Sequence, residues 1–344
     1  MMLTWRNVLS VAGVFAHFCF LWPATLEAAR PLAPPLVEFG RNTTAVAHVA
    51  VREADLAFTP DRMRVRTITT LAETDFLGAD HDAGDLTLRL PAAAAAQSHS
   101  WSEGDSLIVV YSYVRSHNRV REERIMDPDG PRVVAIRGLD QPALFAFDPR
   151  LAELISTAKA HYTDAGAEHV RAKLVQLAGT TDDPATRALL ALELELRPDL
   201  RSGLSEGQRR QLAEAVRQST NLDTRGRLVQ VVSDTGSVRH PWLAELLRRE
   251  LARAPVMADL GSFESYWIQS VLRGLARHGE RADVYRIAAF LRSNAPGVVE
   301  SAVGAMTAID TTAASIAFAR IMLGGDLTAP TRRLLAERLA PPAG

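Results

Sequence analysis

The strongest constraint on the fold is a change in hydrophobic periodicity near residue 149 of this 344-residue chain. Before that point, short apolar runs alternate with turn sequences, a pattern typical of β-strands. After it, apolar residues recur at spacings of three and four, which is typical of amphipathic helices. The sequence therefore predicts a small all-β domain at residues 44–148, followed by an all-α domain at residues 149–344.

The N-terminal part contains five or six short runs with strand character. In DLTLRL, for example, Leu86, Leu88 and Leu90 share one face, as alternate residues of a strand do. At this spacing the runs favour a small antiparallel barrel or sandwich. The segment WSEGDSLIVVY at 101–111 resembles small β-domains of bacterial secreted proteins and names no activity. The expected strands cover 45–51, 63–71, 85–90, 106–114, 132–136 and 143–147.

The C-terminal part contains about ten expected helices between 149 and 340, and they show signs of an internal repeat. Thr186-Arg187 and Thr224-Arg225 lie 38 residues apart, and a leucine stands four residues after each threonine. A period near 38 with two helices per unit is typical of an α-solenoid.

One entry to a helix resembles a known repeat. A proline precedes a stripe of apolar residues, as in the second half of a HEAT-repeat unit: Pro296, Val298, Val299, Ala302, Val303 and Met306. The resemblance to the HEAT-repeat family covers about residues 150–340. It implies a scaffold of stacked helices with a concave surface, a fold that usually binds partners and is rarely catalytic.

The first 29 residues have the pattern of a secretory signal peptide. Arg6 precedes an apolar run at 8–21, and small residues allow cleavage after Ala28 or Ala29. An uncleaved membrane anchor is the alternative. Residues 30–43 are proline-rich and predict a linker. Since Cys19 is the only cysteine, the mature chain has none. We therefore expect a secreted or periplasmic protein without integral membrane association, thiol catalysis or disulfides.

The formal net charge of −1 gives no field that attracts nucleic acid, so no nucleic-acid partner is expected. The chain also lacks a nucleotide-binding loop and a zinc signature. The sequence predicts no cofactor and no metal.

The pentapeptide GLSEG at 203–207 matches the nucleophile elbow of serine hydrolases. That elbow needs a strand before the serine, and the residues before Ser205 are helical. Ser205 followed by Gln208 fits a helix capping box instead. Asp234-Thr-Gly likewise matches the turn of aspartic proteases, but its flanks are helical. An alternative function, a cell-envelope hydrolase, would require Ser205, Asp234 and His240 to converge.

A third possibility is a metal-binding β module with a helical appendage. The turn GADHDAGD carries carboxylates suited to calcium, although a solvated hairpin turn is the favoured explanation. Zinc would require distant histidines to meet. The residues concerned are Asp80, His81, Asp82 and Asp85 for calcium, and His81, His99 and His117 for zinc.

The leading interpretation is a non-catalytic interaction protein that binds a protein partner through its helical surface. Arginine pairs lie on the polar faces of several helices, and a solvated outer face is their simplest explanation. An arginine ridge that grips an acidic partner is the functional one. The candidate partner-binding residues are Arg248 and Arg249, together with the aromatic pair Tyr266 and Trp267. Either ring is a candidate hot spot only if it is exposed, and a tryptophan at helical spacing is more often a core residue.

Overall fold

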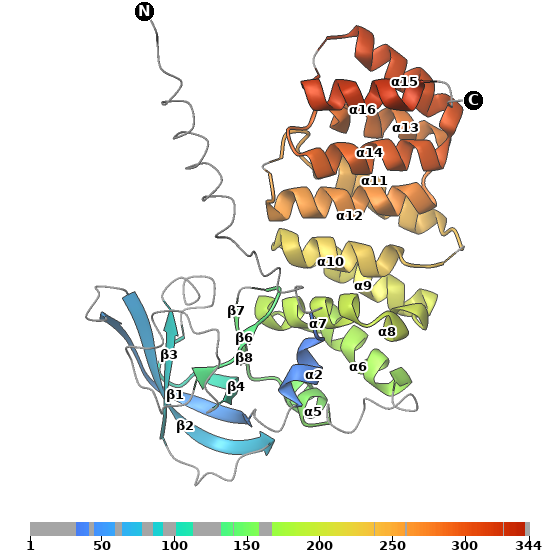
Figure 1. The fold of residues 1–344 in the computed structure, drawn as a ribbon. Helices are drawn as coiled ribbons and strands as arrows, with labels where there is room; N and C mark the ends of the chain where they lie inside the picture. Colours follow the sequence, from blue (N-terminus) through green and yellow to red (C-terminus); the bar gives the residue numbers. More distant parts are fainter. Residues whose placement is uncertain are drawn as a thin grey trace, which may run out of the picture. The chain divides into compact units, whose positions relative to one another are not determined.

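The protein is mostly helical, with a small antiparallel sheet near its N-terminus (Figure 1). The computed structural model describes residues 32–40, 45–58, 64–77, 85–91, 101–112, 132–139, 141–157, 167–236, 238–258, 260–325 and 327–340. The expected signal peptide therefore lies outside the described residues.

The sheet is built around two long neighbouring strands, β1 and β2. In the described residues the strand order is β3-β2-β1-β4-β5, with β8 also pairing with β4. A separate short ladder joins β6 to β7. The strands are β1 (Ala45–Phe58), β2 (Arg64–Leu77), β3 (Asp85–Pro91), β4 (Ser106–Ser112), β5 (Arg132–Val133), β6 (Ala135–Ile136), β7 (Gln141–Pro142) and β8 (Leu144–Ala146).

These strands coincide with the expected apolar runs, except that β1 and β2 extend well past them. The antiparallel sheet is thus present. Its closure into a barrel or sandwich stays a prediction, because residues 78–84, 92–100 and 113–131 lie outside the described residues.

The helices follow the expected change of period. They are α5 (Pro149–Thr157), α6 (Ala167–Thr180), α7 (Pro184–Leu196), α8 (Pro198–Ser202), α9 (Glu206–Gln218), α10 (Leu222–Ser233), α11 (Pro241–Arg253), α12 (Phe263–His278), α13 (Arg281–Ile287), the 3-10 helix η2 (Ala288–Arg292), α14 (Pro296–Ile309), α15 (Thr311–Leu323) and α16 (Ala329–Leu339).

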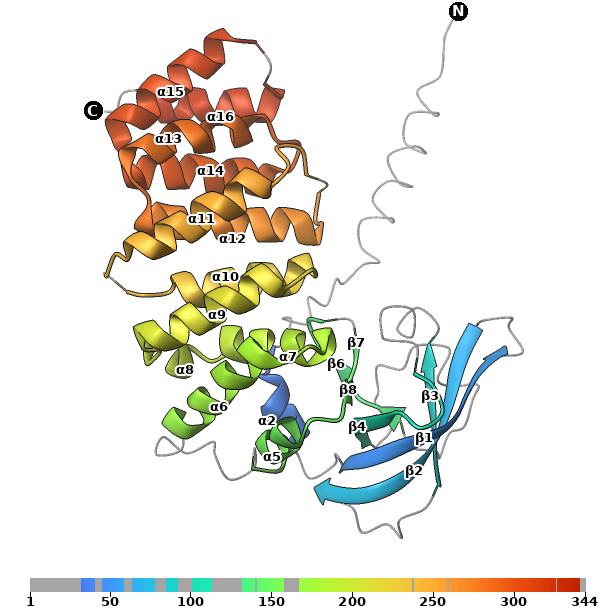
Figure 2. The same cartoon turned by 180° about the vertical axis from the view of Figure 1, so that it is seen from behind.

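The helices pair into consecutive hairpins that stack in two layers. Helices α7, α10, α12 and α14 contact one another in that order and form one layer (Figure 1). Helices α9, α11 and α13 belong to the other layer, which faces the viewer in Figure 2. The apolar stripes explain this arrangement, since the expected core positions Leu243, Leu247, Ile268 and Val271 are all buried.

The N-terminal end of the described chain differs from the expected linker. Residues Pro35–Phe39 form a short helix, α2, whose Leu36 and Phe39 are buried against α7. The backbone N–H of Leu36 donates a hydrogen bond of 2.9 Å to the carboxylate of Glu193 on α7. This part of the segment 30–43 is therefore packed structure, because its apolar residues three apart find a buried surface.

The sheet and the helices share one hydrophobic core. Ile108 and Val110 of β4 and Phe145 of β8 belong to the same buried cluster as the helices, whereas the opposite face of β4 packs against Trp101 and Val49. Residues Pro34–Gly344 accordingly form one compact unit. Among the described residues, none of the helices has both the length and the apolar character needed to cross a bilayer.

Candidate functional site

A buried polar network connects three helices of the α7-α10-α12 layer. Arg227 on α10 forms ion pairs with Glu195 on α7 and, at 2.8 Å, with Asp223 on its own helix. The hydroxyl of Tyr266 on α12 donates to Glu195 over 2.7 Å, and burial and this carboxylate both raise the pKa of Tyr266. These groups satisfy one another, which indicates a structural role.

The same arginine also reaches the sheet. One guanidinium nitrogen of Arg227 donates to the carbonyl oxygen of Gly138, in the turn between β6 and β7, over 2.8 Å. Gly138 has φ of +86°, a conformation that favours glycine. Arg227 therefore ties this turn to α10.

The aromatic candidates for partner binding belong to the interior. Trp267 is 3% exposed, and its ring nitrogen donates to the buried carboxylate of Glu250 over 3.2 Å. Arg225 also pairs with Glu250 and lies over the Trp267 ring at 5.5 Å from its centroid. Tyr266 is half-buried in the network above. Trp267 therefore occupies the core position that is the more common one for a tryptophan at helical spacing, and the hydroxyl of Tyr266 is already engaged.

The two candidate arginines have different surroundings. Arg248 forms an ion pair with the buried carboxylate of Asp283 on α13, with its Nε 2.9 Å from Oδ1. It also forms an ion pair with Glu280. It joins α11 to the next hairpin. Arg249 is 59% exposed and pairs with Glu245 one turn earlier at 3.0 Å. Of this pair, only Arg249 is on the surface.

The structure uses Ser205 as a helix cap, as its sequence context indicates. The Ser205 hydroxyl accepts from the Gln208 N–H, and the Gln208 side chain accepts from the Ser205 N–H. Asp234 ends α10 and forms ion pairs with Arg201 and Arg277. His240 lies 3.9 Å from Glu206. Asp234 thus binds arginines rather than orienting His240, and the hydroxyl of Ser205 accepts the α9 cap bond.

The suggested metal ligands fall mostly outside the described part of the chain. Residues 78–84, His99 and His117 are not described, which leaves the backbone of Asp85 in β3. Within the described residues, no group of three or more histidine, cysteine or acidic side chains is placed to hold an ion.

A surface that the sequence analysis missed lies in the connection from α11 to α12. Met257, Leu260 and Phe263 are 57%, 72% and 55% exposed, respectively. They lie within seven residues of the sequence, and exposed large apolar side chains that form a patch mark an interaction site. The available signal was the apolar content of PVMADLGSF, which separates two helices yet is not polar.

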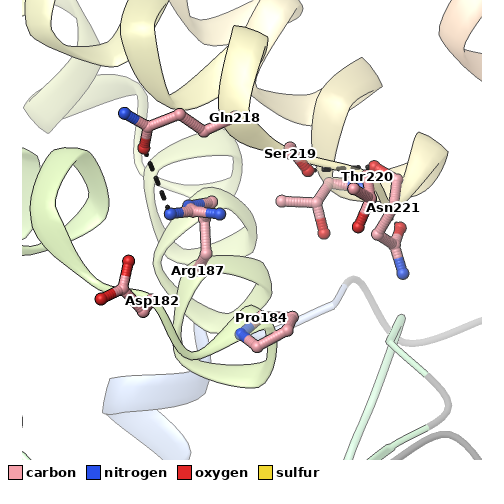
Figure 3. A pocket seen from close by; sticks show the side chains of 8 residues that line it. Asp182, Pro184, Arg187, Gln218, Ser219, Thr220 and Asn221 are labelled. Atoms are coloured by element: carbon pink, nitrogen blue, oxygen red, sulfur yellow. Dashed lines mark hydrogen bonds between the residues drawn. The ribbon is translucent and has the colours of Figure 1, made fainter.

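A second missed feature is a cavity of about 300 Å³ at the starts of α7 and α10 (Figure 3). Asp182 and Arg187 line it from the α6–α7 hairpin, Gln218 lines it from the end of α9, and Asn221 lines it from the connection into α10. Arg187 is 7% exposed, and burial lowers its pKa. The sequence pattern indicated Arg187 only as part of the 38-residue repeat, and gave no sign of a cavity.

Comparison with family models, curated proteins and solved structures finds no match to this chain. Its residues and their geometry therefore carry the functional argument.

Proposed function

We propose that this chain is a secreted or periplasmic, non-catalytic interaction protein that binds a protein partner through its stacked helices. The observation that carries the proposal is the exposure of Met257 and Leu260 in the α11–α12 connection and of Phe263 at the start of α12. Burying such side chains against a partner supplies binding free energy in proportion to the apolar area removed from water. Residues 1–29, with their signal-peptide pattern, support the location outside the cytoplasm.

We further propose that the helical hairpins are a HEAT-like α-solenoid. The second helices of successive hairpins, α7, α10, α12 and α14, contact their neighbours in sequence order, as repeat architecture requires. The matched N-termini of α7 and α10, each capped three residues before a threonine, also support a repeat. The β domain, as a closed barrel or sandwich, would then be a second module beside the solenoid.

The apolar connection defines the kind of partner. Arg249 and Arg253 at the end of α11 are 59% and 55% exposed and lie just before it in the sequence. Each pairs with a glutamate of its own helix, Glu245 and Glu250, and remains exposed to solvent. Apolar side chains that follow exposed cations in the sequence suit a protein segment that presents apolar residues next to acidic ones. In this proposal Arg249 lies at the rim of the interface, whereas Arg248, Tyr266 and Trp267 support it from the interior.

Site-specific photocrosslinking tests the proposal. A photoreactive phenylalanine analogue replaces Leu260 in one full-length variant and Ile316, which is 47% exposed on α15, in a matched variant. Expressed in the source cells, the Leu260 variant should form one discrete adduct that the Ile316 variant does not. Equal labelling at both positions, or no adduct at Leu260, would contradict the proposal.

A further inference from the structure

Two equivalent positions of the helical hairpins differ in a way that points to a ligand. Arg187 and Arg225 each stand four residues after the N-cap of their helix, Asp183 in α7 and Asn221 in α10. Arg225 has a carboxylate partner, since its Nε lies 3.2 Å from Glu250. Both arginines donate from Nε to the carbonyl oxygen nine residues earlier, Val216 for Arg225 and Ala178 for Arg187. The other contacts of Arg187 are the carbonyl oxygen of Thr181 and, at 3.4 Å, the amide oxygen of Gln218. Its hydrogen-bond acceptors are therefore neutral, although the nearby carboxylates of Asp182 and Asp183 oppose the lowering of its pKa by burial.

The threonines just before these arginines differ in whether the side-chain hydroxyl has a hydrogen-bond partner. The hydroxyl of Thr186 donates to Asp183 over 2.6 Å. The hydroxyl of Thr224, which is 1% exposed, has no hydrogen-bond partner among the described residues. A buried hydroxyl without a partner is unfavourable. Thr224 and Arg187 line the same cavity, so both irregularities meet at one place.

The charges around this cavity restrict what it can hold. The helices that begin there, α7 and α10, have 13 and 12 residues, and a helix N-terminus favours negative charge. The Asp183 carboxylate already caps α7, whereas α10 is capped by the neutral side chain of Asn221. Asp182 also lines the cavity, and Figure 3 shows its carboxylate beside Arg187 without a hydrogen bond between them. A second negative charge on the ligand would be repelled by Asp182, whereas a donor group on the ligand would be attracted.

We propose that this cavity binds a small monocarboxylate that also carries a hydroxyl or ammonium group. The carboxylate pairs with Arg187 in the place that Glu250 takes at Arg225, and the donor group faces Asp182. A volume of about 300 Å³ lies at the lower end of the range for small-molecule sites, so it admits a ligand of this class together with water molecules. The proposal does not depend on the protein-binding surface at α11–α12.

Calorimetric titration of the full-length mature protein tests this with four probes: acetate, glycolate, glycine and inorganic phosphate, each against sodium chloride at matched ionic strength. We expect glycolate or glycine to bind with a dissociation constant of about 1 mM or tighter, acetate more weakly, and phosphate most weakly. Absence of heat with every carboxylate, or the tightest binding with phosphate, overturns the proposal.

Three variants assign the binding to the cavity. Arg187→Gln should weaken binding at least about tenfold, because it removes the charged donor. Thr224→Val keeps the side-chain volume and removes a hydroxyl without a partner, so it should weaken binding without lowering the melting temperature. Asp182→Asn, at an exposed residue, should abolish the preference for glycine over acetate. Unchanged affinity in both Thr224→Val and Asp182→Asn overturns the proposal even if Arg187→Gln does not fold.

Discussion

The carboxylate of Glu193 on α7 accepts a hydrogen bond of 2.9 Å from the backbone N–H of Leu36, which lies 157 residues earlier in the chain. Glu193 is fully buried, and its nearest cation, Arg197, is 3.7 Å away. Burial raises the pKa of Glu193 from 4.5 to about 7, against the opposing effects of the Leu36 N–H and Arg197. The contact that seats α2 on the helices is therefore sensitive to pH.

This gives a pH dependence with a defined sign. Because the folded-state pKa is raised, the folded protein binds the proton more tightly than the unfolded chain does. The contribution of Glu193 to stability is complete below pH 4.5 and is lost as the pH rises through about 7. Glu193→Gln should remove this loss, which amounts to about 3 kcal/mol. Denaturant unfolding at pH 5 and pH 8.5 measures it, with exposed Glu214→Gln as the control. Parallel pH profiles in wild type and Glu193→Gln would show that the carboxylate has no such role.

The close approach of α10 and α12 predicts a contrast between two glycines. A methyl group on Gly226 would lie 2.8 Å from the Tyr266 ring and 3.1 Å from the Cα of Trp267, whereas one on Gly304 meets nothing within 4 Å. We expect Gly226→Ala to destabilise the protein by about 1–3 kcal/mol through overpacking. Gly304→Ala, in the exposed face of α14, should stabilise it by about 0.5–1 kcal/mol. Equal effects in thermal unfolding would contradict this packing of the two helices.

The buried carboxylate of Glu250 offers a test of the interior pairing. Glu250→Gln leaves the guanidinium of Arg225 without its anion next to Trp267, and should cost about 3–5 kcal/mol. The matched change Glu245→Gln breaks an exposed pair with Arg249 and should cost less than about 1 kcal/mol. Chemical denaturation of both variants measures the loss of unfolding free energy. A loss below about 1 kcal/mol for Glu250→Gln would indicate that the pair is exposed to solvent.

The role of Ser205 can be separated from that of a nucleophile. Ser205→Ala removes the cap of α9 and should lower the free energy of unfolding by about 1 kcal/mol, whereas Ser205→Asp should restore most of it. Equilibrium unfolding provides the measurement. Because an aspartate oxygen can accept the same backbone hydrogen bond as the serine hydroxyl, failure of Asp to replace Ser would contradict the role of Ser205 as a helix cap.

The sequence predicted the elements whose pattern is local. The stripe of Leu243, Leu246 and Leu247 indicated its helix, and Ser205 with Gln208 indicated a helix start; the structure confirms both. Contacts between segments far apart in the sequence could not be predicted from local patterns. Pro34 and Pro35 suggested a linker because nothing local reveals that Leu36 and Phe39 meet α7. The sequence left open whether Trp267 is exposed, because its partner, Glu250, lies on the preceding helix.

The missed candidate sites have the same physical origin. Arg187 and Thr224 belong to different hairpins, and only the stacking of α7 and α10 brings them to one cavity. The exposure of Leu260 depends on how the α11–α12 connection leaves the helices. Periodicity assigns residues to the faces of a helix and does not apply to an irregular connection.

The central claim is that the α11–α12 connection binds a protein partner. Its most direct test is the affinity of the crosslinked partner, measured by calorimetry, for the variant Met257→Ser/Leu260→Ser/Phe263→Ser and for the exposed control Ile316→Ser. The account predicts at least about a hundredfold loss for the triple variant and less than about threefold for the control. An affinity for the triple variant within threefold of wild type would contradict it.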